Sequence, residues 1–181
     1  IALALALMLC ILACLLGISW RTDGLPLGVA EYFLLRAPFS LHLGWIIVAS
    51  AVSVNVHADA AKAAQETLLA SAVTWTAVVL VVVFAFALAV PNPDPWVGLV
   101  AAWAFAGISS ELSNPAKLGD PSRFNPSEWD AVTLAGLRGA ARAVSMLALG
   151  LAVVAAISKV WKAMRQPAQA HACSELELPC R

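Results

Sequence analysis

The feature that most constrains this chain is a succession of long apolar segments that carry no internal charge. The clearest of them runs from Leu68 to Val90 and is rich in Val, Ala and Phe. A bilayer core about 30 Å thick takes roughly 20 helical residues, so an uncharged run of this length is typical of a membrane-spanning helix. Of the 181 residues, 61% are hydrophobic and only 12% are charged, which is more apolar than a soluble domain requires. The sequence therefore predicts an integral membrane protein.

The apolar segments predict an all-α fold, a polytopic transmembrane bundle of about five helices. The expected spans are residues 1–20, 39–57, 68–90, 96–112 and 143–161, each to within a few residues. We expect one helical domain over residues 1–165, followed by a polar, disordered tail over residues 166–181. Because the chain begins inside an apolar run, we also expect that an N-terminal segment precedes Ile1.

Residue spacing also predicts how several helices begin and pack. Residues 28–38 suit a short helix at the membrane surface, after which Pro38 takes a first-turn position in the second span. The last helix is expected to begin near Pro126, with Ser127 and Asp130 as its capping pattern. In the fourth span, small residues at every fourth position would let another helix approach closely. They are Gly98, Ala102, Ala106 and Ser110.

The second span carries a polar face formed by His42, Ser50, Ser53 and His57. Polar groups within a membrane normally face the bundle interior or a ligand, so this face is a candidate site. The two histidines are separated by about 22 Å along a helix and cannot share one metal ion. Each could instead be an axial ligand of a tetrapyrrole metal, haem iron or chlorophyll magnesium. In the alternative interpretation both sit at helix ends and contact water or Asp59.

Tryptophan is unusually frequent, with seven residues in the chain. Trp45, Trp75 and Trp103 lie within spans, where rigid aromatic planes could stack on a flat ligand or simply pack in the core. The remaining four are expected at the membrane surface, where tryptophan commonly anchors helices. These are Trp20, Trp96, Trp129 and Trp161.

Two arginines near the start of the last span lie one helical turn apart on the same face. Arg138 and Arg142 could meet Glu111, contact a lipid phosphate, or extend to water at the membrane surface. The sequence leaves these alternatives open.

Several classes of function are not indicated. Formal net charge is zero, so nucleic acid is not an expected partner. The chain has no nucleophile elbow, phosphate-binding loop or His-Glu-x-x-His motif, and its cysteines lack zinc-finger or redox spacing. We therefore predict a protein that is not an enzyme.

Two stretches show a resemblance to a known family. They are residues 38–46, Pro-Phe-Ser-Leu-His-Leu-Gly-Trp-Ile, followed by Val48 and Ala49, and residues 103–108, Trp-Ala-Phe-Ala-Gly-Ile. Both resemble the tryptophan-rich sensory protein branch of the translocator-protein (TspO/MBR-like) family. The resemblance implies five helices per protomer and a pocket between helices that binds porphyrins, sterols or other flat apolar molecules.

Together these observations predict a membrane protein that binds a tetrapyrrole (chlorophyll, haem or porphyrin), a carotenoid or a lipid. The alternative is an accessory subunit of a large photosynthetic or respiratory membrane complex that coordinates chlorophyll. Expected partners are membrane lipids and other membrane-protein subunits, and the expected location is an organelle membrane, thylakoid or mitochondrial. The predicted ligand-binding residues are His42, Trp45, Ser53, His57, Trp75 and Trp103, with His42 and His57 as the metal ligands.

Overall fold

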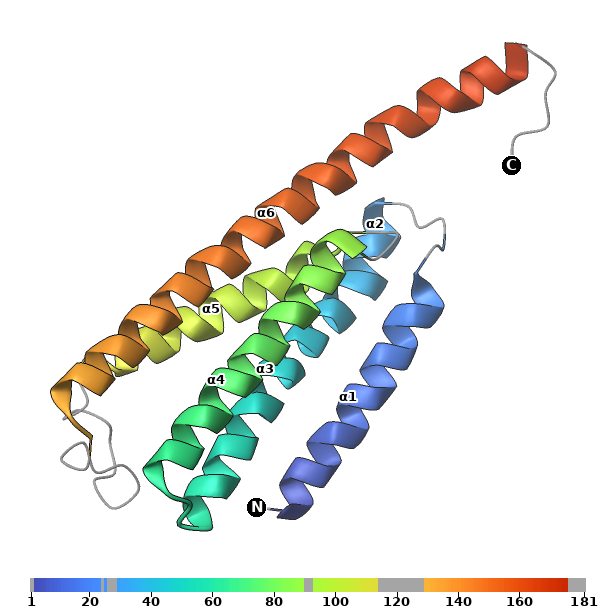
Figure 1. Cartoon of the computed structure of the whole chain (residues 1–181). Coiled ribbons are helices and arrows are strands. Elements are labelled where there is room, and N and C mark those ends of the chain that lie inside the picture. Colours follow the sequence, from blue (N-terminus) through green and yellow to red (C-terminus); the bar gives the residue numbers. More distant parts are fainter. Residues whose placement is uncertain (1, 24, 26–28, 90–92, 114–128, 176–181) are drawn as a thin grey trace.

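The computed structural model describes residues 2–23, 25, 29–89, 93–113 and 129–175, and within them all regular structure is helical. Five long helices form the bundle, as predicted (Figure 1). They are α1 (Ala2–Thr22), α3 (Ala37–Ala60), α4 (Gln65–Phe84), α5 (Pro95–Glu111) and α6 (Ala131–Glu175). Three short elements adjoin them: α2 (Val29–Glu31) and two π-helical segments, η1 (Tyr32–Arg36) and η2 (Ala85–Ala89).

Among the described residues, four helical stretches are long and apolar enough to cross a membrane. They are Ala2–Thr22, Tyr32–Ala60, Gln65–Leu88 and Ala131–Lys162. α5 has 17 residues, which is at the lower end of the length range of spanning helices. It packs against both α3 and α6, so much of its surface meets protein. The apolar helices confirm the prediction of an integral membrane protein.

α3 is the central helix and packs against α1, α4 and α5, while α6 lies along α5 and its last turns project beyond the other helices (Figure 1). Glycine permits two of these close approaches. A Cβ at Gly44 would lie 3.1 Å from the Cα of Val97, and one at Gly98 would lie 3.1 Å from the carbonyl oxygen of Ala148. The predicted small-residue packing in the fourth span is confirmed at Gly98 and Ala102, which are buried.

The structure corrects the predicted start of the second span. Residues 29–36 do not form a separate surface helix, because α2, η1 and α3 run together without a break. In an α-helix the ring of Pro38 would clash with the carbonyl group four residues earlier. The chain widens into a π-helix just before this proline, and the Ala37 amide donates to the carbonyl of Tyr32.

The last helix also differs from its predicted range. Pro126 and Ser127 lie outside the described residues, and α6 begins at Ala131. Asp130 caps it by accepting hydrogen bonds from the Thr133 hydroxyl and from the Thr133 amide, the latter at 2.8 Å. These bonds lower the pKa of the Asp130 carboxyl. The helix continues to Glu175, nine residues past the predicted start of the tail at residue 166, and residues 176–181 lie outside the described residues.

Candidate functional site

A cavity of about 740 Å3 lies between α3, α4, α5 and α6. Small-molecule pockets commonly have volumes of roughly 300–1,000 Å3, so this one is large enough for a ligand. Its lining is mainly aliphatic, and Val56 and Val73, which line it, are more than half exposed on the bundle surface. The cavity therefore opens sideways, toward the lipid. Its lining includes Ala51, Asn55, Leu69, Ala72, Trp75, Thr76, Val79, Phe105, Ile108, Leu112, Leu137 and Ala141.

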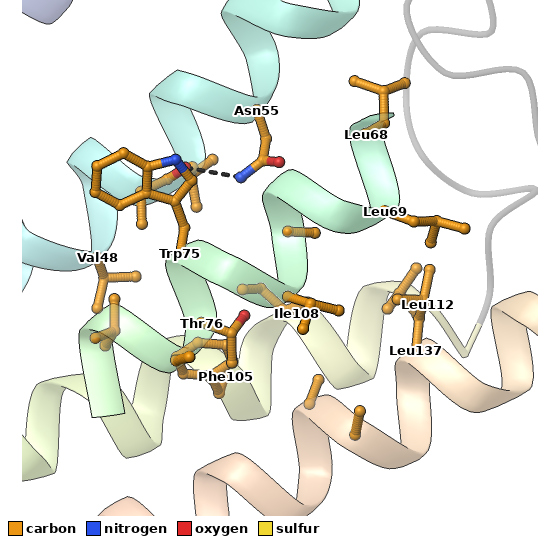
Figure 2. A pocket seen from close by; sticks show the side chains of 18 of the residues that line it. Val48, Asn55, Leu68, Leu69, Trp75, Thr76, Phe105, Ile108, Leu112 and Leu137 are labelled. Carbon is orange, nitrogen blue, oxygen red and sulfur yellow. Dashed lines mark hydrogen bonds between the residues drawn. The ribbon is translucent and has the colours of Figure 1, made fainter. Parts of the chain in front are cut away.

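Few polar groups reach this cavity, and Asn55 is the most informative of them. Its Nδ2 donates to the carbonyl of Ala51 at 2.9 Å, whereas its buried Oδ1 has no hydrogen-bond partner. Figure 2 shows the indole of Trp75 beside Asn55, reaching from α4 toward α3. A buried acceptor without a partner is costly, so a rotation of the Asn55 side chain that brings Oδ1 to a donor group on a ligand would be favoured.

Local sequence explains why α3 and α4 face this space together. On α3 the lining residues recur every three or four positions from Val48 to Asp59, which places them on one helical face. The helix then ends in a Schellman motif, in which Ala63 donates to the Ala58 carbonyl and Lys62 to the Asp59 carbonyl. Lys62 adopts a left-handed φ of 55°, and this tight turn returns the chain as α4 alongside α3.

Of the six predicted ligand-binding residues, only Trp75 lines the cavity. Trp45 of α3 and Trp103 of α5 do meet each other, with ring centroids 5.4 Å apart. However, their side chains are 45% and 67% exposed, so the pair lies on the outer surface of the bundle. The structure brings these two tryptophans together away from the cavity, and their binding of a ligand stays a prediction.

The polar face of the second span does not converge on one site. Ser53 is half-buried and donates to the sulfur of Met8 on α1 at 3.4 Å, away from the cavity. His42 and His57 are exposed, and neither lines the cavity. Among the described residues that line the cavity there is also no cysteine. A tetrapyrrole metal held there would lack an imidazole or thiolate ligand, so the residues present suit binding by shape rather than by axial ligation.

Sequence reasoning missed a buried network of charges, at the end of the bundle where α1 ends and α5 begins. Arg36 is 6% exposed and Asp94 is 1% exposed. The guanidinium of Arg36 donates at 2.9 Å to the carboxylate of Asp23 and at 2.9 Å to the carbonyl of Thr22, and its Nε lies 3.9 Å from the Asp94 carboxylate. These contacts fasten the connection after α1 to the interior of the bundle.

Asp94 also organises the start of α5. Its carboxylate accepts hydrogen bonds from the Trp96 amide at 3.0 Å and from the Ser40 hydroxyl at 2.5 Å. The Trp96 indole in turn donates to the Tyr32 hydroxyl at 2.9 Å, and the Lys159 ammonium lies 3.6 Å from the centre of the Tyr32 ring. The sequence signal was an aspartate directly before the first turn of an apolar helix, which is a capping position.

The family comparison extends over most of the described chain. A family model described as TSPO-like protein matches residues 1–161, which include the five main helices up to Trp161 and all of the cavity lining. The chain belongs to the TSPO-like family. The predicted translocator-protein (TspO/MBR-like) relationship is therefore confirmed, whereas membership of its tryptophan-rich branch stays a prediction. No curated protein and no solved structure matches this TSPO-like chain significantly.

Proposed function

We propose that this TSPO-like membrane protein is not an enzyme and that it binds a flat apolar molecule in the cavity between α3, α4, α5 and α6. The observation that carries the proposal is the cavity itself, about 740 Å3 in volume and lined mainly by aliphatic side chains. Trp75 offers a rigid plane for stacking, and Asn55 would offer one directional contact once its side chain rotates and exposes the buried, unpartnered Oδ1. This combination suits a ligand that is mostly apolar and carries an N–H or O–H group.

A metal-free tetrapyrrole supplies the flat, mostly apolar ring. A sterol has an apolar body and one hydroxyl, so it also supplies the O–H donor. The proposal assigns no catalytic step to the cavity. We propose an organelle membrane, thylakoid or mitochondrial, as the location.

The test is a titration of protoporphyrin into the purified full chain in detergent. Binding is monitored by the quenching of tryptophan fluorescence and by the absorption of the porphyrin. Ala72 lines the cavity, so Ala72→Phe should fill part of it and weaken binding at least tenfold. Ala70 lies on the same helix, is exposed and does not line the cavity, so Ala70→Phe is the matched control and should leave affinity unchanged. Equal affinities for the two variants would exclude this cavity as the porphyrin site.

The same preparation distinguishes the alternative, an accessory subunit of a photosynthetic or respiratory complex. Gentle solubilisation of native membranes should yield a small particle if the chain binds its ligand alone. Migration with a large pigmented complex would favour the subunit instead.

A further inference from the structure

A second, smaller hollow of about 320 Å3 lies on the outside of the bundle, between the last turns of α5 and the first turns of α6. It is separate from the large cavity, since none of its lining residues lines that cavity. Two arginines from α6, Arg138 and Arg142, lie on one wall. Ser109 and Ser110 of α5 lie on the other, together with Ser113 in the turn that follows this helix. A site rich in cations and hydroxyls is unusual beside lipid, so its chemistry requires an explanation.

The arginines bring uncompensated positive charge to this hollow. Arg138 and Arg142 are four residues apart, so their side chains leave α6 on the same face, with Cβ atoms roughly 6 Å apart. In the described part of the chain, no carboxylate lies within ion-pair distance of either one, so the contact with Glu111, one of the alternatives left open by the sequence, is not formed. The pair is therefore available to an anion from outside the chain.

Serine hydroxyls fix the two helices that form the hollow. Ser109 donates to the carbonyl of Arg138 at 3.2 Å, and Ser145 donates to the carbonyl of Ala102 at 2.8 Å. These bonds join α5 to α6 at the level of the arginines and so hold the site in shape. The exposed hydroxyl of Ser110 makes no hydrogen bond within the described residues and can donate to a ligand.

The position along the helices points to a lipid as the source of the anion. Arg138 lies level with Ser109, two residues before α5 ends at Glu111, and this is where a headgroup would sit. Toward the membrane interior the hollow continues to Ala106 and to Met146, whose side chain is 65% exposed. A phosphate at the arginines would thus be followed by an apolar surface suited to an acyl chain.

We propose that this hollow binds the phosphate group of an anionic phospholipid. Guanidinium groups bind phosphate oxygens through paired hydrogen bonds, and two of them on one helix face can hold one phosphate. Ser110 adds a neutral donor, and Met146 contacts the first part of an acyl chain. The site is independent of the cavity proposed for the flat apolar ligand.

The experiment places the full chain in nanodiscs with equal amounts of phosphatidylglycerol and phosphatidylcholine, and counts the lipids retained by native mass spectrometry. Each arginine should contribute a preference of about fivefold for the anionic lipid. The double variant Arg138→Gln, Arg142→Gln should therefore show a preference for the anionic lipid that is roughly 25-fold smaller. The matched control, Arg21→Gln with Lys162→Gln, removes the same charge at the other end of the bundle and should keep the preference. The double variant Arg138→Lys, Arg142→Lys should retain part of the preference for the anionic lipid.

A variant that preserves both arginines tests whether lipid binds in the hollow itself, independently of any effect of removing the charges on folding. Ala106→Leu changes an exposed residue of the hollow and should reduce retention by obstructing the lipid while both arginines remain. The proposal is overturned if the control pair loses as much lipid as the arginine pair, or if Ala106→Leu retains lipid normally. It is also overturned if excess inorganic phosphate binds as well as the anionic lipid in phosphatidylcholine nanodiscs, since the site would then hold a free anion.

Discussion

Substituting Gly98 by leucine tests the packing of α5 on α6 directly. A Cβ at this position would already lie 3.1 Å from the carbonyl oxygen of Ala148 and 3.1 Å from the Cβ of Ala152. Carbon atoms in good contact are about 3.5–4.0 Å apart, so even the first added atom forces the helices to move by a few tenths of an ångström. Gly98→Leu adds three further carbons in the same direction.

The expected loss of stability is about 3 kcal/mol, because overpacking a close contact typically costs roughly 1–3 kcal/mol and this change lies at the upper end. For a chain of this size that corresponds to a fall in Tm of about 6–12 °C. The measurement is thermal unfolding of the purified protein in detergent, monitored by circular dichroism.

Gly107→Leu is the matched control, since Gly107 lies on the same helix and a Cβ there would meet nothing within 4 Å. Both variants gain the same helix propensity, so the difference between them isolates the contact with α6. Gly107→Leu should change Tm little. Equal Tm values for the two variants would refute the close approach of the two helices at Gly98.

Three further predictions concern the charge network, the α3–α4 turn and the histidines. Asp94→Asn should destabilise the protein by about 3 kcal/mol, because it leaves Arg36 buried with less compensating charge. Glu66 is exposed, so Glu66→Gln should leave the stability unchanged in the same thermal measurement. Equal effects of the two substitutions would contradict a structural role for the network. Lys62→Gly should stabilise the protein by about 1 kcal/mol, because glycine adopts a left-handed φ without strain. Lys62→Ala keeps a Cβ and should not stabilise it. Chemical denaturation measures the stability of both variants, and an equal gain in stability for alanine would count against strain at Lys62. The double variant His42→Ala, His57→Ala should leave porphyrin affinity unchanged, because neither residue lines the cavity. A clear loss of binding in the titration would instead support the histidine ligands predicted from the sequence.

The sequence was sufficient to predict the membrane bundle because burial in lipid demands long uncharged helices, and such runs are visible residue by residue. The close packing at Gly98 was predictable for a similar reason, since small residues recur at helical spacing in that span. The resemblance noted around Trp45 and Trp103 led to the right family, since the TSPO-like family match is confirmed over residues 1–161.

The cavity could not be located in the same way. In a soluble helix the buried face differs in polarity from the exposed face, but here apolar residues predominate on every side of α3 and α4. Val52, which lines the cavity, and Ile46, which is buried elsewhere in the core, look alike in sequence. Polar residues therefore drew attention to His42 and His57, which the structure places on the exterior.

The charge network was missed for another reason. Arg36 and Asp94 are 58 positions apart, and each occurs beside a proline-containing segment that suggests a surface turn. Only the packing of the start of α3 against the start of α5 brings them together. A long-range pairing of this kind leaves no periodic signal in a single sequence.

The central claim is that a flat apolar ligand occupies the cavity between α3, α4, α5 and α6. The most direct test is photocrosslinking with a diazirine-labelled porphyrin in lipid nanodiscs, followed by mapping of the labelled peptides by mass spectrometry. The account predicts labels on the cavity faces of α3 and α4, within residues 48–59 and 68–80, and their competition by unlabelled porphyrin. Labels confined to the outer surface around Trp45 and Trp103, with none on α4, would contradict it.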